Sequence, residues 1–337
     1  MRNPMIPAPI SAGLLLSYKC NSRCRHCLYA CSPQWKADWL SVADAEDILG
    51  QLAPKMQAAS GINAGIGVNQ GLHFTGGEPF LNFSLLVEVV AVAHWLGIRS
   101  TFVETNCYWC TDDQTTLDKL SQLKQAGLKG MLISANPFVL EHVPFERTLR
   151  AVQIGGQVFP RGVMVYQPFF YQQFCDLGLH GTLSLEEYLR KAPDGLQHAE
   201  LLPGGRVSYA LAPLFRTYPA ECFSDTSCQR ELIRDWHVHV DNYGNYVPGY
   251  CAGLALGDVH DLRTMCEEGL DLDARPVLSA LLTSMAALRR LAKANGYVEK
   301  EGYVSKCHLC IDIRRHLAHV GSFVELKPLE FYDRLDD

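Results

Sequence analysis

Three cysteines fall within eight residues near the start of the chain, and their spacing constrains the protein more than any other feature. Cys20, Cys24 and Cys27 follow a CxxxCxxC pattern. Iron–sulfur clusters are held by cysteine thiolates, and a fully ligated cubane takes four of them. The local run supplies three, which leaves one iron with an open position where a substrate or cofactor can bind. The pattern therefore predicts a cluster with a chemical task.

At these residues the chain resembles the radical S-adenosylmethionine (radical SAM) superfamily. The signature of that family is CxxxCxΦC, with an aromatic residue or His before the last cysteine, and His26 fills that position here. The resemblance implies a 4Fe-4S cluster whose open iron is chelated by SAM, and reductive cleavage of SAM to methionine and a 5′-deoxyadenosyl radical. The alternative interpretation is a zinc knuckle, although structural zinc sites are usually closed by four ligands.

A glycine-rich segment follows a short predicted strand at residues 71–75. Gly76, Gly77, Glu78 and Pro79 form a GGEP sequence, and glycines allow the backbone to approach a ligand closely. Alone, such a segment would be an ordinary turn. The resemblance implies that these four residues contact the amino group of the methionine part of SAM.

Polar residues end the next two predicted strands, at residues 99–104 and 130–135. The resemblance implies that Glu104 and Asn106 lie near the SAM ribose and that Ser134 faces SAM, whereas helix capping is the alternative for the first pair. Cys107 and Cys110 form a second CxxC, for which we favour free thiols over a redox pair. The role of the nearby Cys31 stays open.

Hydrophobic strands alternate with amphipathic helices through the first two thirds of the chain, which predicts an α/β fold with a parallel sheet. A fifth strand is expected at residues 162–166, and strand-like segments at 199–202 and 206–209. The pattern does not choose between an open sheet, a full barrel and a partial barrel. The resemblance implies an open (β/α)6 partial TIM barrel, so we expect a radical SAM core over residues 1–215 and a second domain over residues 216–337.

The C-terminal third predicts a β-hairpin at residues 236–247, with Asn and Gly at its turn, and a long helix at residues 277–295. Around them stand four cysteines, enough for a complete 4Fe-4S cluster: Cys228, Cys251, Cys307 and Cys310. This part resembles the SPASM or twitch extension of radical SAM enzymes, which implies one auxiliary cluster. A four-cysteine zinc site is the alternative, and Cys222 could replace Cys228 as a ligand.

Composition narrows the functional classes. The net charge of −6 argues against a protein whose main task is to hold nucleic-acid phosphates. We expect no membrane segment and a cytoplasmic location, because no signal peptide or long apolar run is seen. Thirteen cysteines in a reducing compartment favour metal ligation over disulfides, and oxygen-sensitive clusters suggest an anaerobic setting.

The resemblance implies an enzyme, an oxidoreductase by its expected chemistry, that abstracts hydrogen from a peptide, a protein side chain or a small metabolite. The auxiliary cluster would assist oxidation or bond formation, and a reductase, flavodoxin or ferredoxin would donate electrons. No catalytic base can be assigned. We expect no leader-peptide-binding domain before the first strand, which weakens the hypothesis that the substrate is a peptide. The alternative is a non-catalytic iron–sulfur protein for electron transfer or sensing, which would have no need of the GGEP segment.

Overall fold

The computed structural model of the chain describes residues 3–59, 65–321 and 323–337. The chain divides into two compact units. We call residues 10–24 and 31–200 the sheet unit, and residues 1–9, 25–30 and 201–337 the helical unit. The predicted domain division at residues 215 and 216 stays a prediction. No helix in the described part of the chain is long and apolar enough to cross a membrane.

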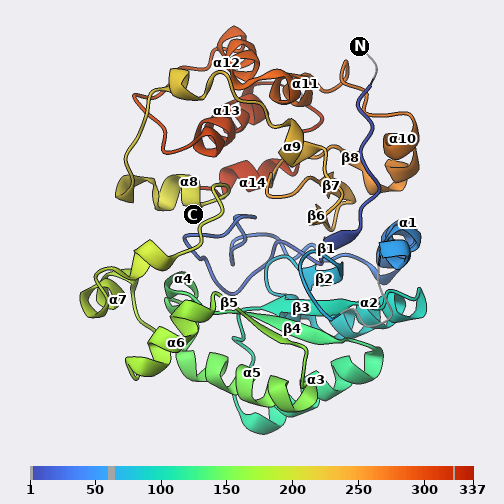
Figure 1. The fold of residues 1–337 in the computed structure, drawn as a ribbon, viewed down its shortest axis with the longest axis vertical. Helices are drawn as coiled ribbons and strands as arrows, with labels where there is room; N and C mark the ends of the chain where they lie inside the picture. Colours follow the sequence, from blue (N-terminus) through green and yellow to red (C-terminus); the bar gives the residue numbers. More distant parts are fainter. Residues whose placement is uncertain (1–2, 60–64, 322) are drawn as a thin grey trace. The chain divides into compact units, whose positions relative to one another are not determined.

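The sheet unit contains five parallel strands in the order β5-β4-β3-β2-β1 (Figure 1). The strands are β1 (Ser11–Leu15), β2 (Gly71–Thr75), β3 (Thr101–Thr105), β4 (Gly130–Ser134) and β5 (Val163–Tyr166). Every residue of β1 and β2 is buried, as expected for a parallel sheet whose strands are covered on both faces. The predicted α/β class with a parallel sheet is confirmed.

Helices connect these strands and cover one face of the sheet. A Cβ atom built at Gly155 of α5 would meet the side chains of Met131 and Val163, which places that helix against β4 and β5. Figure 1 shows α3 and α5 running along this side. The helices of the unit are α1 (Val42–Ala59), α2 (Phe83–Trp95), α3 (Asp113–Ala126), α4 (Pro137–Leu140), α5 (Phe145–Val158), α6 (Pro168–Asp176) and α7 (Leu185–Lys191), with 3-10 turns at Pro79–Asn82 and Gly195–His198.

Local sequence explains where several of these helices begin and end. Asp112 caps α3 by accepting a hydrogen bond from the Thr115 N–H, and Gly127 ends it with a left-handed φ of 113°. Ser184 and Glu187 form a capping box at the start of α7. These caps depend on neighbouring residues alone.

The helical unit holds the predicted hairpin, formed by β6 (Val238–Val240) and β7 (Asn245–Val247), with β8 (Gly257–Asp258) added antiparallel to β7. Asp241 fixes the turn by accepting hydrogen bonds from the Tyr243 and Asn245 N–H groups, each at 3.0 Å. The hairpin prediction is confirmed. The helices are α8 (Val207–Ala210), α9 (Gln229–Leu232), α10 (Leu262–Glu267), α11 (Pro276–Thr283), α12 (Met285–Ala294), α13 (Lys306–Val320) and α14 (Leu329–Asp333), with 3-10 turns at Ala212–Leu214, Ala220–Phe223 and Val259–Asp261.

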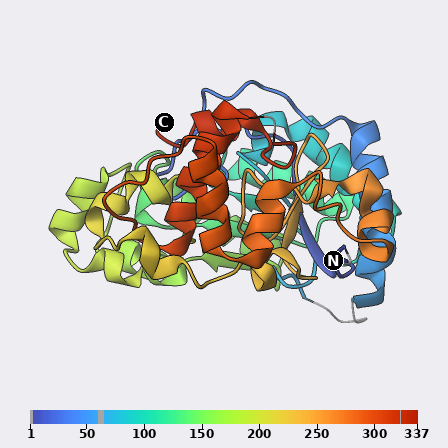
Figure 2. The same cartoon turned by 90° about the horizontal axis from the view of Figure 1, so that it is seen from above.

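Three local predictions were wrong. The helix expected at residues 277–295 is two helices, because Ser284 is extended (φ −173°, ψ 162°) and caps α12 through the Ala287 N–H. The strand-like segment expected at 206–209 is mostly helix α8, and no strand forms at 199–202. Gly205, with a φ of 59°, turns the chain directly before α8, so the alternating side chains there do not enter a sheet. Figures 1 and 2 show α13, in red, beside α12.

Candidate iron–sulfur and cofactor sites

The GGEP segment is bound by its backbone to the residues that lead into the cysteine loop. The Gly77 N–H donates to the Ser17 carbonyl at 2.8 Å, and the Glu78 N–H donates to the Lys19 carbonyl at 3.0 Å. A Cβ atom at Gly77 would overlap the Lys19 carbonyl, and one at Gly76, whose φ is 124°, would overlap that of Ser17. Only glycine fits this contact, which explains why two glycines stand where the strand ends.

Glu78 is a buried carboxylate with three hydrogen-bond donors. It accepts from the Thr105 hydroxyl at 2.9 Å, from the Asn106 N–H at 2.9 Å and from the Phe80 N–H at 3.2 Å. Burial raises the pKa of Glu78 to about 7, against the effect of these donors. The side chain thus ties the GGEP segment to the end of β3, and the next residue, Pro79, begins a 3-10 turn.

Asn106 connects the end of β3 with the first part of the cysteine motif. Its amide donates to the Asn21 side chain at 2.9 Å and to the Ser22 hydroxyl at 3.3 Å, and lies 3.9 Å from the Cys20 sulfur. The Ser22 N–H also points at that sulfur, at 3.4 Å. Hydrogen bonds to the sulfurs influence the reduction potential of an iron–sulfur cluster, and the role of Cys20 as a ligand stays a prediction.

Glu104 and Ser134 lie on the sheet face that carries Thr75. Glu104 pairs with Leu132 in the register of β3 and β4, and side chains two residues apart share a face, so Ser134 is on that face too. The Glu104 carboxylate accepts from the Thr75 hydroxyl at 2.8 Å. This face is opposite to the one on which Met131 packs against α5, although Ser134, at the end of β4, also borders residues of α4, α5 and α6.

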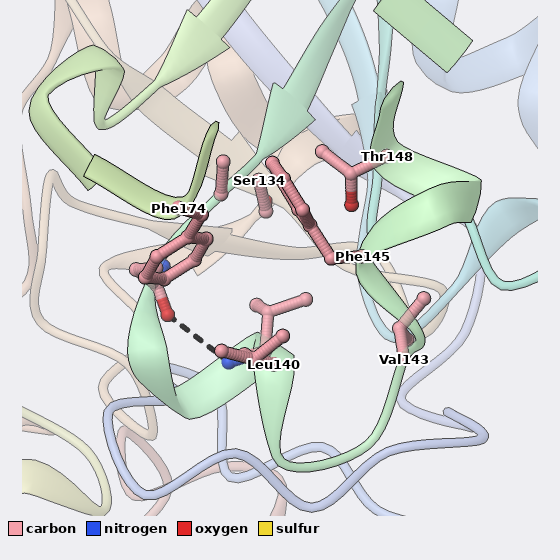
Figure 3. A pocket seen from close by; sticks show the side chains of 9 residues that line it. Ser134, Leu140, Val143, Phe145, Thr148 and Phe174 are labelled. Atoms are coloured by element: carbon pink, nitrogen blue, oxygen red, sulfur yellow. Dashed lines mark hydrogen bonds between the residues drawn. The ribbon is translucent and has the colours of Figure 1, made fainter. Parts of the chain in front are cut away.

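A small cavity lies beside the end of β4, bordered by Ser134 and by residues of α4, α5 and α6 (Figure 3). Its lining is largely apolar and includes Leu140, Phe145 and Phe174. A volume of about 10 Å³ is close to the minimum for one water molecule. The cavity is therefore a packing defect and not a binding site for SAM.

The second CxxC forms a buried pair. Cys107, with a left-handed φ of 66°, and Cys110 are both fully buried, and the Cys110 N–H donates to the Cys107 carbonyl at 3.1 Å. Burial, followed by the neighbouring Cys110 thiol, raises the pKa of Cys107 well above its usual value. The adjacent Trp109 stacks on Phe80 at 3.8 Å between ring centroids. The burial of both cysteines and the raised pKa of Cys107 agree with the preference for free thiols.

The remaining residues of the first motif belong to the helical unit. Cys20 and Cys24 lie in the sheet unit, and His26 and Cys27 lie in the helical unit. The Cys27 carbonyl accepts from the Arg206 N–H at 3.0 Å. Burial, with a smaller effect from the Arg206 charge, lowers the pKa of His26 to about 4, so its imidazole is neutral. The loop that carries Cys31 returns to the sheet unit, where the Cys31 thiol donates to the Gly76 carbonyl at 3.4 Å.

The four C-terminal cysteines belong to one unit and influence one another. Burial and the neighbouring Cys310 thiol are the largest causes that raise the pKa of Cys228 to about 12, and burial together with nearby thiols raises the pKa of Cys307 and of Cys251 to about 12. Cys228 is buried whereas Cys222 is exposed, which favours Cys228 as the ligand. Cluster binding would have to deprotonate these thiols.

Histidines near the four cysteines have packing roles. His308 accepts a hydrogen bond from the Val304 N–H at 3.2 Å and contacts the ring of Tyr303 edge-on. His237 and His239 pack against each other at 4.9 Å between ring centroids. Among the described residues, no three His, Cys, Asp or Glu side chains converge in the way that holds a single metal ion.

The structure adds residues that sequence reasoning did not identify. Thr105 binds Glu78 and also accepts from the Trp109 indole at 3.0 Å. Lys306 and Arg314 stand near the four cysteines, and both lower the pKa of Cys307 against the larger effect of burial. Their spacing from Cys307 and Cys310 along one helix was a signal that could have been used, since residues three and four apart share a helix face.

The comparisons with known proteins concern both the sequence and the fold. The sequence profile of one family, described as a 4Fe-4S single cluster domain, matches residues 13–137. This range contains the CxxxCxxC motif and the GGEP segment, so the match agrees with the predicted resemblance to radical SAM enzymes. No curated protein matches the chain at a significant level.

Several solved structures are similar to the chain at low identity. BtrN in complex with AdoMet and 2-DOIA is 14% identical, with 83% of this chain and 89% of that chain covered and a TM-score of 0.48. Native anSMEcpe with bound AdoMet and Cp18Cys peptide is 13% identical, with 92% and 96% covered and a TM-score of 0.43. PhdJ bound to a substrate intermediate is 12% identical, with 100% and 96% covered and a TM-score of 0.31.

Proposed function

We propose that the protein is a radical SAM enzyme that reductively cleaves SAM and abstracts hydrogen from a peptide, a protein side chain or a small metabolite. Cys20, Cys24 and Cys27 would hold the 4Fe-4S cluster. When bound and reduced, that cluster supplies the electron that splits SAM into methionine and a 5′-deoxyadenosyl radical. The observation that carries the proposal is the pair of backbone hydrogen bonds that join the GGEP segment to Ser17 and Lys19, directly before Cys20.

The chain's own residues prepare this site. Ser17 and Lys19 hold Gly77 and Glu78 through backbone hydrogen bonds, so the GGEP segment and Cys20 keep a fixed distance. Buried Glu78 links the segment to β3 and supplies negative charge when ionised. SAM carries positive charge on its sulfonium and amino groups, and a carboxylate nearby favours such a ligand. Glu104, Asn106 and Ser134 are proposed to contact SAM from the strand ends.

We also propose one auxiliary 4Fe-4S cluster on Cys228, Cys251, Cys307 and Cys310. Four cysteines in one unit, three of them with a pKa that is raised by burial and by neighbouring thiols, would be a complete ligand set for a cubane. A cluster with four protein ligands has no open iron, so its proposed task is to accept an electron during substrate oxidation or bond formation. The substrate class and the electron donor are proposals that follow from the resemblance.

The first test is SAM cleavage by anaerobically purified protein that has been reconstituted with iron and sulfide. With SAM and dithionite, the proposal predicts 5′-deoxyadenosine by mass spectrometry, and none from Cys24→Ala. A protein that binds iron and SAM but yields no 5′-deoxyadenosine, with or without candidate substrates, would contradict the proposal and favour an electron-transfer protein.

A further inference from the structure

Helix α13 carries two of the four C-terminal cysteines and two cations that hold the loops of the other two. Cys307 and Cys310 lie in its first turns. Lys306 donates from Nζ to the carbonyl of Ser227, next to Cys228, at 3.2 Å. Arg314 donates from Nη1 to the carbonyl of Ala252, next to Cys251, at 2.9 Å. One helix therefore connects all four cysteines.

Arg314 is a buried cation. The residue is 4% exposed, and among the described residues it forms no ion pair with a carboxylate, whereas the next residue, Arg315, is paired with Asp336. The Arg314 guanidinium also donates to the hydroxyl of Tyr332, at 3.2 Å, which in turn donates to the Gly253 carbonyl, and it interacts with the side chain of Cys310. A buried guanidinium that meets only neutral groups is unfavourable unless another negative charge compensates it.

The thiols are the groups that can supply this negative charge. Cys251 stands next to the Ala252 carbonyl that accepts from Arg314, and Cys307 and Cys310 lie on the same helix as Arg314. Four thiolates around a [4Fe-4S]2+ core carry a total charge of −2, and one added electron makes it −3. Net charge and hydrogen bonds around the sulfurs set the potential of such a cluster, so a fixed cation favours the reduced state.

Lys306 makes the same kind of backbone hydrogen bond beside a cysteine, but its positive charge acts more weakly on that cysteine. It is paired with Glu231 at 3.5 Å, and its side chain is 22% exposed. A surface ion pair and solvent both reduce the field that its charge exerts on Cys228. The two cations of α13 therefore differ in burial and in pairing, and Arg314 is the one whose charge has no carboxylate to offset it.

We infer that Arg314 is a positioning residue that holds the Cys251 loop against α13 and raises the reduction potential of the auxiliary cluster, which makes that cluster an electron acceptor. The inference rests on the proposed auxiliary cluster. A higher potential makes the cluster a better acceptor for the electron that is left on the substrate after hydrogen abstraction.

The test uses the full chain with Cys20, Cys24 and Cys27 all changed to Ala, so that only the auxiliary cluster remains. After anaerobic reconstitution this background should contain about four irons per chain, as one cubane requires. A background without iron would overturn the auxiliary cluster itself. With iron present, its midpoint potential is measured by a dithionite titration followed by EPR.

In this background Arg314→Gln should shift the midpoint potential to a more negative value, with iron content retained. Arg315→Gln is the matched control, because the next residue on the same helix is paired with Asp336 at 2.6 Å and its removal changes the net charge equally. Lys306→Gln should produce a smaller shift than Arg314→Gln. Equal shifts in Arg314→Gln and Arg315→Gln, or none in Arg314→Gln, would overturn the inference.

Loss of iron in Arg314→Gln is also informative. If Arg314→Lys retains the iron and a potential near the parent value, the cation is required and the inference holds. If Arg314→Lys is folded by circular dichroism yet also loses iron, the shape of the guanidinium and its bond to Ala252 matter and its charge does not, which would overturn the assignment of the potential.

Discussion

The two cysteine sites of this protein differ in how they are built and in the charges that surround them. Cys20 belongs to a motif of only eight residues. Amides and hydroxyls surround it, and the carboxylates of Glu78 and Glu104 belong to the same unit. The C-terminal set spans residues 228–310 and is surrounded by the cations Lys306 and Arg314. The difference matches the groups that we propose, since SAM is cationic and a four-thiolate cluster is anionic.

The comparison also separates two ways in which a chain can specify a site. The first site is specified by short motifs, CxxxCxxC and GGEP, and by backbone contacts between them. The second needs the tertiary fold, because the start of α9, the loop after β7 and helix α13 each bring one or two cysteines. The predictions below test this difference, in order of decreasing effect.

Gly77→Ala should disrupt the first site most strongly. The added Cβ would overlap the Lys19 carbonyl, so the backbone must move, at a cost of about 3 kcal/mol. We expect loss of 5′-deoxyadenosine formation and a lower melting temperature. Gly156→Ala, at an exposed position of α5 where nothing lies within 4 Å, should be neutral or stabilising by about 0.5 kcal/mol. Full SAM cleavage by Gly77→Ala would break the link between the GGEP segment and the cysteine loop.

Glu78→Gln should change how stability depends on pH. The folded-state pKa of about 7 exceeds the ordinary value of 4.5, so the folded chain binds a proton more readily than the unfolded chain. The associated stabilisation is complete below pH 4.5 and is lost as the pH rises through 7, by roughly 3 kcal/mol at most. Urea unfolding of the wild type from pH 4.5 to 8 should show this decrease relative to Glu78→Gln.

The control for this effect is Glu88→Gln, which removes an exposed carboxylate of α2. Its unfolding free energy should follow the wild type at every pH. If the difference between wild type and Glu78→Gln does not change with pH, Glu78 is ionised throughout and its three hydrogen bonds outweigh its burial.

Asn106→Ala should have a smaller effect, confined to the geometry of Cys20. The amide bonds to Asn21 and Ser22 would be lost, and a loss of about 1.4 kcal/mol of positioning corresponds to roughly a tenfold slower SAM cleavage. Iron content should stay unchanged. Asn82→Ala, which removes the cap of α2, should reduce stability by about 1 kcal/mol without slowing the reaction, and equal slowing in both variants would show that Asn106 acts only on stability.

Much of the fold could be predicted because its signals are local. Strand runs such as residues 71–75, and the helix end at Gly127, depend on a few neighbouring residues. The helix break at Ser284 was not predicted, because the apolar residues on both sides of it are typical of one continuous helix. The extended backbone of this single serine ends α11 and begins α12. The turn before α8 was missed for a similar reason, since Gly205 changes the chain direction.

The candidate sites were predictable in their cysteines and not in their supporting residues. The motifs pointed to Glu78 and Asn106, but not to the bond between them, which depends on how the end of β3 meets the GGEP segment. Arg314 was missed because a positive residue in a helix is usually solvated. Only its burial beside the Cys251 loop, seen in the folded chain, makes it a candidate for function.

The most direct test of two sites with separate tasks is the formation of 5′-deoxyadenosine, measured side by side in Cys24→Ala and Cys310→Ala after identical anaerobic reconstitution. The account predicts no product from Cys24→Ala, and product from Cys310→Ala close to the wild-type amount, because SAM cleavage needs only the first site. Product from Cys24→Ala, or its loss in a folded Cys310→Ala that keeps the first cluster, would contradict the account.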